Sequence, residues 1–185
     1  KSLTLKHSDI SDSDLVSVAA LADLKKLDLT GTDVGNSGLA VIGKMVGLKE
    51  LLLNYGRFTD EGLAELKNLV NLRRLELLRT RTRDPALASL AALTHLQLLN
   101  LDYTAVTDQG LQSLELLSKL THLRLDSAAV TDKGVEHLKK LTSLESVNLY
   151  HTLVTDTGFN ALKAALPGCK IVWVRESALP TRRGS

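Results

Sequence analysis

The feature that most constrains this chain is a pair of apolar residues, two positions apart, that recurs every 24 residues without a slip. The pairs are Leu3/Leu5, Leu27/Leu29, Leu51/Leu53, Leu75/Leu77, Leu99/Leu101, Leu123/Leu125, Val147/Leu149 and Ile171/Trp173. A fixed period of this length is typical of a solenoid, in which each unit buries its apolar face only against its neighbours. We therefore expect one continuous domain over residues 1–174, with about eight short strands at the pairs.

Each unit contains two different periodicities, which residues 120–141 show clearly. The paired leucines alternate with period two, as a short strand requires, whereas Val135, Leu138 and Leu141 are spaced three apart, as one face of a helix requires. Between them lies Thr131-Asp132-Lys133-Gly134, and the same start recurs at 59–62, 107–110 and 155–158. A hydroxyl followed by a carboxylate can cap the free amides of a helix. Each unit is thus a strand, a turn and a helix, which predicts the α/β fold class. We interpret the aspartate of each unit as a helix cap rather than as a metal ligand or catalytic group.

Hydroxyl residues follow the strands at a second repeated position. They are Ser8, Thr32, Thr80, Thr104 and Thr152. We expect each hydroxyl to satisfy the loop backbone of a neighbouring turn. Gly56 and Ala128 occupy the same position without a hydroxyl, which predicts that their turns are looser or are bonded to water.

These motifs support a family resemblance. The units at 96–117, 120–141 and 144–165 resemble bacterial leucine-rich repeats whose helices begin Thr-Asp-x-Gly-Leu, and they are similar to GALA-type and F-box-associated cysteine-containing repeats. The resemblance implies a right-handed solenoid with a parallel sheet on its concave side and helices on its convex side. It also implies a protein that binds other proteins, often through the concave sheet. Threonine replaces the cysteine of the cysteine-containing type and no F-box sequence is visible, so the bacterial relatives are favoured.

Composition excludes several function classes. The formal net charge of +2 argues against a whole-protein electrostatic role on nucleic acid or anionic membrane, and no apolar run approaches the roughly 20 residues that span a bilayer. The single Cys169 rules out an internal disulfide and favours a cytoplasmic or cysteine-poor bacterial compartment. There is no Gly-rich phosphate loop, no paired-His metal motif and no nucleophile with an identifiable base. We expect that the protein is not an enzyme and that it binds no cofactor and no metal.

The most informative surface residues lie beside and after the strands of repeats three to five. Because neighbouring strands are about 4.8 Å apart, Arg79 should lie between Tyr55 and Tyr103, and Tyr and Arg are enriched at interface hot spots. The predicted partner site comprises Leu52, Tyr55, Arg57, Arg74, Leu78, Arg79, Arg81, Leu98 and Tyr103, its three leucines running diagonally as exposed apolar area. Such a basic ledge can take an acidic peptide or a phosphate. Two alternatives are that Tyr55, Arg79 and Tyr103 stack only to stabilise the ledge, and that the arginines are ordinary solvated surface charge.

The same region also departs from the repeat pattern. Arg83-Asp84-Pro85-Ala86 replaces Thr-Asp-x-Gly, and Thr82 occupies a core position that other units fill with Val, Ile or Phe. Local departures from a consistent pattern tend to mark function or strain. They add weight to repeats three to five.

A second candidate patch lies further along the sheet. It comprises Asn100, Asp102, Arg124, Asp126 and Tyr150. Like charges on adjacent strands are unfavourable, so Asp102 and Asp126 call for a cation, a partner lysine or Arg124 to relieve them. Two carboxylates on a flat sheet do not supply the six or more oxygens that calcium prefers, which disfavours a metal.

We therefore expect a non-catalytic protein–protein interaction module. One alternative is a structural spacer or recognition segment of a larger multidomain protein, and another is a phosphate or nucleic-acid binder that uses the arginines. The bare edge at Leu3 and Leu5 permits edge-to-edge self-association. Trp173 is expected to cover the last face of the core, and residues 175–185 are expected to form a mobile tail.

Overall fold

A computed structural model describes residues 1–178 of the chain, and its centre is one eight-stranded parallel sheet with strands in sequence order. The strands are β1 (Ser2–Thr4), β2 (Lys26–Asp28), β3 (Glu50–Leu52), β4 (Arg74–Glu76), β5 (Leu98–Asn100), β6 (His122–Arg124), β7 (Ser146–Asn148) and β8 (Lys170–Val172). The register sets each first leucine opposite its equivalent one repeat on, as in Leu51 opposite Leu75. The 24-residue period of the sequence is thus the register of the sheet.

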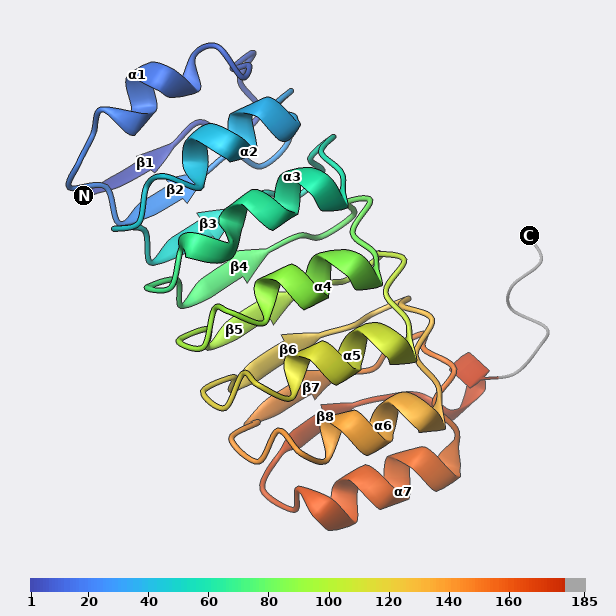
Figure 1. Cartoon of the computed structure of the whole chain (residues 1–185). Coiled ribbons are helices and arrows are strands. Elements are labelled where there is room, and N and C mark those ends of the chain that lie inside the picture. Colours follow the sequence, from blue (N-terminus) through green and yellow to red (C-terminus); the bar gives the residue numbers. More distant parts are fainter. Residues whose placement is uncertain (179–185) are drawn as a thin grey trace.

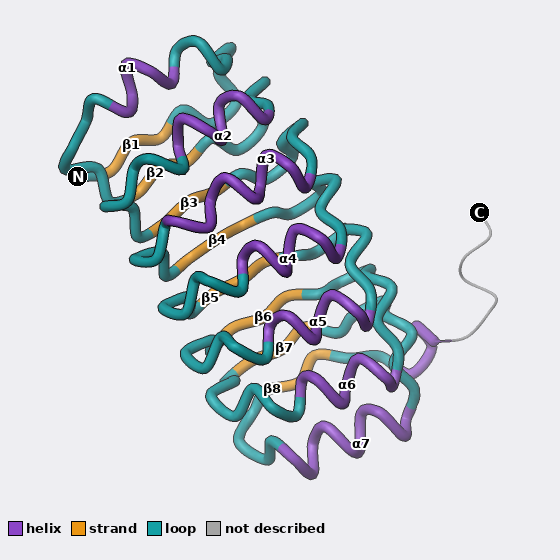
Figure 2. The backbone as a smooth tube through the Cα atoms, viewed as in Figure 1, coloured by secondary structure: helices purple, strands orange, loops and turns teal. Residues whose placement is uncertain are grey.

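The helices lie side by side on one face of that sheet (Figure 1). They are α1 (Leu15–Ala19), α2 (Asn36–Ile42), α3 (Asp60–Ala64), α4 (Asp84–Leu90), α5 (Asp108–Leu114), α6 (Asp132–Leu138) and α7 (Asp156–Ala165), with short 3-10 helices η1 (Glu65–Asn68) and η2 (Arg175–Ala178). Strand-to-helix loops follow one side of the molecule and helix-to-strand loops the other (Figure 2). The predicted right-handed solenoid is confirmed. We call the sheet face away from the helices the open face; it corresponds to the predicted concave side.

The core is a set of aliphatic ladders between sheet and helices. Leu75, Leu99 and Leu123 are at most 1% exposed, so the paired leucines of the inner repeats remove nearly all of their surface from water, whereas Leu3 and Leu5 at the first strand are partly buried. At the last repeat, the rings of Trp173 and Phe159 stack with centroids 4.6 Å apart. The Trp173 Nε1 donates to the carbonyl of Val154 at 2.9 Å, which satisfies its polar atom while its ring packs against the core.

The helix-start aspartates join successive repeats. Asp108 Oδ1 accepts from the Thr131 amide at 2.7 Å, and Asp108 Oδ2 accepts from the Thr131 hydroxyl at 2.6 Å. Thr131 in turn accepts the amide of Lys133 and is the actual helix cap. The prediction that the aspartate caps its own helix is wrong, because the nearest free amide to its carboxylate belongs to the next repeat. The same pairs link Asp84 to Thr107 and Asp132 to Thr155.

The glycine of the Thr-Asp-x-Gly start follows from this link. A Cβ on Gly134 would overlap Asp108 Oδ1 and lie 2.8 Å from Val130 Cγ1. Gly158 stands in the same relation to Asp132. In these two repeats glycine leaves room for the aspartate of the preceding repeat to reach its threonine, whereas in repeat four Ala86 holds the equivalent position and Asp60 bonds to Arg83 instead.

The hydroxyl residues after the strands act within their own turns. Thr80 Oγ1 donates to the Leu77 carbonyl at 2.7 Å, and Thr104 Oγ1 to the Leu101 carbonyl at 2.7 Å. The expectation of bonds to a neighbouring turn is therefore wrong, since the carbonyl three residues back is closer. Ala128 keeps the backbone bond of this turn, with its amide 3.0 Å from the Leu125 carbonyl, so its turn is not looser.

The predicted tail begins with η2. Arg175 Nη2 lies 2.7 Å from Asp156 Oδ1, which ties this segment to the start of α7. The first four residues of the tail are thus in regular structure, and residues 179–185 lie outside the described part of the chain.

Candidate functional site

The strand ends of the open face share an unusual backbone conformation. Tyr55, Arg79 and Tyr103 have positive φ angles of 60°, 52° and 56°, in the left-handed region that Gly31 adopts at the equivalent position with φ 67°. That conformation costs a non-glycine residue about 1–2 kcal/mol. The turn bonds hold it in place at every repeat. We call Tyr55, Arg57, Arg79, Arg81 and Tyr103 the strand-end ledge.

One cation–π contact dominates the ledge. The Arg79 guanidinium carbon lies 4.7 Å from the centroid of the Tyr103 ring, within the distance at which such pairs attract. Arg79 holds the position between Tyr55 and Tyr103 in successive repeats, and among residues 1–178 its cation–π contact is with Tyr103 and not with Tyr55. Arg79 leans toward the following repeat, which draws it away from the preceding one. Tyr55 and Tyr103 remain 48% and 43% exposed.

Carboxylates neutralise three of the six arginines in and around the ledge. The ion pairs are Arg57 Nη1 to Asp33 Oδ1 at 3.3 Å, Arg74 Nε to Glu76 Oε1 at 2.9 Å and Arg83 Nε to Asp60 Oδ2 at 2.9 Å. Asp33 and Asp60 belong to the preceding repeat and lie after its strand, so a search limited to the strands does not find them. Within the described chain, Arg79 and Arg81 keep no carboxylate partner. The unneutralised charge on the ledge is therefore smaller than the sequence suggests.

The three predicted leucines do not form an exposed diagonal. Leu52, Leu78 and Leu98 are all partly buried. Leu98 lies opposite Arg74 at the strand starts, whereas Leu78 lies beyond the end of β4. The register therefore places Leu98 at the start of the strands and Leu78 beyond their end. The predicted diagonal stripe of exposed leucines is wrong.

Leu98 and Arg74 instead line a shallow cavity at the strand starts. This strand-start cavity of about 450 Å³ is lined by Lys49, Glu50, Arg73, Arg74, Gln97, Leu98, Thr121 and His122. Arg79 follows Arg74 by five positions, which at about 3.3 Å per residue is a separation of at most about 16 Å. The predicted site is thus two separate features of repeats three to five, one at each end of the strands. The sequence analysis did not assign Lys49, Gln97, Thr121 and His122 to the site. These residues lie one or two positions before the first leucine of a pair, and comparing those positions between repeats could have found them.

The second predicted patch is a closed network around Asp102. This carboxylate is 1% exposed and accepts from the Asp126 amide at Oδ1, at 2.7 Å, and from Arg124 Nε at Oδ2, at 2.6 Å. Burial raises the pKa of Asp102 above its ordinary value, although the Asp126 amide and Arg124 oppose that rise. Arg124 is thus the internal cation that the sequence called for.

The remaining members of that patch are also engaged. Asp126 Oδ1 accepts from the Ser127 hydroxyl at 2.9 Å and lies 3.2 Å from His151 Nδ1. Asn100 Oδ1 accepts from the Asp102 amide at 3.0 Å, and the Tyr150 ring lies 3.8 Å from that of His151. Residues 1–178 contain no group of three or more His, Cys, Asp and Glu side chains that could hold a metal ion.

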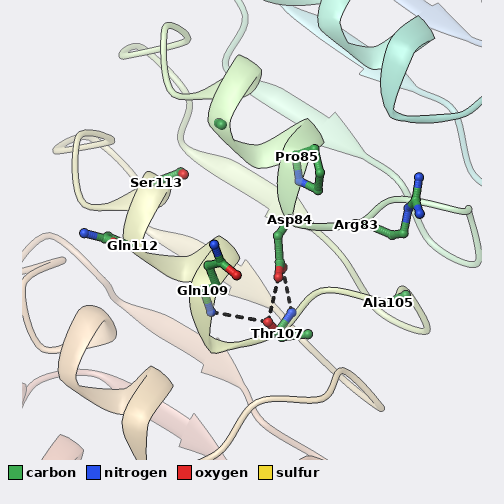
Figure 3. A pocket seen from close by; sticks show the side chains of 9 residues that line it. Arg83, Asp84, Pro85, Ala105, Thr107, Gln109, Gln112 and Ser113 are labelled. Atoms are coloured by element: carbon green, nitrogen blue, oxygen red, sulfur yellow. Dashed lines mark hydrogen bonds between the residues drawn. The ribbon is translucent and has the colours of Figure 1, made fainter.

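A cavity of about 560 Å³ with mixed polar and apolar lining lies on the helix side, between α4 and α5. Figure 3 shows Asp84 pointing at Thr107, whose amide and hydroxyl both donate to it. Thr107 also accepts the amide of Gln109. The carboxylate that faces this cavity is therefore used to join two repeats.

Two further observations bear on chemistry. Burial raises the pKa of the Cys169 thiol, which lowers the fraction of reactive thiolate at neutral pH. Among the described residues, no helix has the length and apolar character needed to cross a membrane.

Comparison with known proteins agrees with this geometry. A family model described as a leucine-rich repeat matches residues 21–43, 92–114 and 117–139. These three segments of the chain are leucine-rich repeats. Proteins of this class generally mediate protein–protein interaction, and the fold is typically a non-enzymatic scaffold.

Solved internalins share the fold. An internalin (inlF) from Listeria monocytogenes superposes with a TM-score of 0.76 at 25% identity, over 92% of this chain and 46% of the internalin. Internalin C2 of the same organism gives a TM-score of 0.71 at 19% identity, over 97% of this chain and 76% of its own. This leucine-rich-repeat chain therefore spans less than half the length of the first internalin. No curated protein matches it in sequence.

Proposed function

We propose that this leucine-rich-repeat chain is a non-catalytic protein-binding module that contacts its partner through the open face of repeats three to five. The observation that carries the proposal is the Arg79–Tyr103 pair, an exposed cation on an exposed ring with no carboxylate beside it. Residues of these two types are the most enriched at interface hot spots. The bacterial, GALA-type resemblance is part of the same proposal and is supported by the Thr-Asp-x-Gly-Leu helix starts.

The backbone of the ledge supports the proposal only together with its composition. The left-handed conformation recurs at the equivalent position of other repeats, as at His7 and Ser127, so it belongs to the repeat. What distinguishes repeats three to five is that Tyr, Arg and Tyr follow one another at this position, and Tyr55 and Tyr103 are exposed there.

Affinity capture from a lysate of the source organism tests the proposal. The original chain is compared with an Arg79→Ala/Tyr103→Ala variant and with a Glu136→Ala/Lys139→Ala variant, which breaks an ion pair of α6 on the helix side. We expect a partner that the original and the helix-side variant retain and the ledge variant loses. Equal capture by all three, with folding verified by circular dichroism, would place recognition elsewhere. No capture at all would favour a spacer role.

A further inference from the structure

Three cations occupy equivalent positions at successive strand starts. Lys25, Lys49 and Arg73 each precede the first residue of a strand, and all three are exposed. Lys49 and Arg73 donate their amides to the carbonyls of Lys25 and Lys49 respectively, at 2.7 Å each. These bonds fix the backbone of the three residues at the strand spacing of about 4.8 Å. We call them the strand-start row.

The charge of this row is not cancelled. None of the three side chains has an ion pair among residues 1–178. The nearby carboxylate of Glu50 lies 3.3 Å from Lys26 Nζ, and Glu76 binds Arg74. The positive potential of the strand-start row therefore faces solvent.

The row leads directly into an apolar contact point. Lys49 and Arg73 line the strand-start cavity, and so does Leu98 of the next strand, which is partly buried. A partner that follows the row from β2 to β5 would meet cations over three repeats, and then Gln97 at the row position with the aliphatic Leu98 beside it. A nucleic-acid backbone gains nothing from that leucine, whereas a protein segment can place an apolar side chain against it, so the lining favours a protein.

The spacing of the row fits an α-helix. Two strand spacings span about 9.6 Å, and helix positions i and i+7 are separated by about 10.5 Å along the axis. Carboxylates at i, i+4 and i+7 lie on one helix face, with neighbours about 5–6 Å apart. Same-face residues of an extended peptide repeat every 6.6 Å or so, and they lose register with the row after one step.

We propose that the strand-start row and strand-start cavity bind an acidic helical segment of a partner protein. Its carboxylates contact Lys25, Lys49 and Arg73, and an apolar side chain one turn further on contacts Leu98. This inference rests on the proposed function, because it assigns a partner chemistry to a second part of the open face in the same repeats.

The test uses a fluorescent helical peptide with glutamate at i, i+4 and i+7 and leucine at i+11, and a matched peptide with glutamine in place of glutamate. Binding to the full chain is measured by anisotropy at low ionic strength. We expect the glutamate peptide to bind at least tenfold more tightly than the glutamine peptide. A Lys49→Ala/Arg73→Ala variant should weaken binding at least tenfold, whereas Lys44→Ala/Lys67→Ala, which removes two exposed lysines elsewhere, should change it less than twofold.

Three results would overturn the inference. The first is that the folded chain does not bind the glutamate peptide. The second is that Lys44→Ala/Lys67→Ala weakens binding as much as Lys49→Ala/Arg73→Ala does. The third is peptide binding that depends on Arg79 and Tyr103 but not on Lys49 and Arg73, which would leave the proposed function standing. A single-stranded oligonucleotide that binds through the row when the peptide does not would assign it to nucleic acid instead. If the peptide binds as expected but the ledge variant captures the partner as well as the original chain does, only the role of the strand-end ledge is rejected.

Discussion

The two faces of this solenoid obey different rules. On the helix side, the same contacts recur from unit to unit, as Asp108 to Thr131 and then Asp132 to Thr155. On the open face, the strand-end turns keep one backbone conformation while the side chain changes from Gly31 to Tyr55. Repeated side chains indicate a structural role, because each copy performs the same link. Varied side chains on a constant backbone indicate positions that folding leaves free.

The largest effect is expected where a side chain is added to the helix-side link. A Gly134→Ala Cβ would overlap Asp108 Oδ1, so we expect unfolding free energy to fall by about 2 kcal/mol, within the range typical of overpacking. Helix propensity alone would change it by about 1 kcal/mol in the opposite direction. Denaturant unfolding at equilibrium measures the difference.

Gly168 provides the matched control for that substitution. A Cβ there meets nothing within 4 Å, so Gly168→Ala should change stability by less than about 0.5 kcal/mol. If Gly134→Ala proved as stable as Gly168→Ala, the close approach of the aspartate would not be what selects glycine.

A smaller effect is expected on the open face, where the backbone rather than the side chain is constrained. Removing the ring of Tyr55 in two ways isolates its positive φ, since Tyr55→Gly should be more stable than Tyr55→Ala by about 1 kcal/mol. Thermal and denaturant unfolding of both variants measure this difference. At Tyr150, which is not among the positive-φ residues, alanine should equal or exceed glycine. The same order at both positions would refute strain at the ledge.

The smallest effect separates the two faces by pH. On the open face, burial raises the pKa of Asp102; on the helix side, hydrogen bonds from Lys140 and then His137 lower the pKa of Glu115. The contribution of Asp102 to stability is thus present at low pH and is lost as the pH rises through its raised pKa. The contribution of Glu115 is present above its unfolded pKa and is lost as the pH falls through its lowered one.

Stability measured against pH for Asp102→Asn and Glu115→Gln tests these signs. The stability of the original chain relative to Asp102→Asn should fall as the pH rises, and that relative to Glu115→Gln should rise. Carboxyl NMR titration of the original chain should show Asp102 titrating above its ordinary range and Glu115 below it. Slopes of the same sign would contradict the assignment.

Repeat four shows how far the pattern could be followed. Its Thr82 was expected in the core, and it is fully buried with its hydroxyl 2.7 Å from that of Thr80. The replacement of threonine by Arg83 looked like a break in the helix start. Asp60 still accepts the Arg83 amide at 2.9 Å and also binds its guanidinium, so the link between repeats continues with a different side chain.

The candidate site was predictable in part. The register placed Arg79 next to Tyr103, and the structure brings them into contact. The partners of Arg57 and Arg83 were not predictable from the strands, because Asp33 and Asp60 approach from loops and helix starts one repeat earlier. Ion pairing depends on where long side chains reach, and periodicity does not record that.

The sequence by itself determined the solenoid, its strand register and the residues of its core. A 24-residue period leaves each unit one way to bury its leucines, which is against the equivalent leucines of its neighbours. Only the tertiary structure decided which charges remain unpaired, that Leu98 and Leu78 lie at opposite ends of the strands, and that Asp108 serves the following repeat. Those outcomes depend on distances of a few ångströms between side chains of different repeats, which the period alone does not fix.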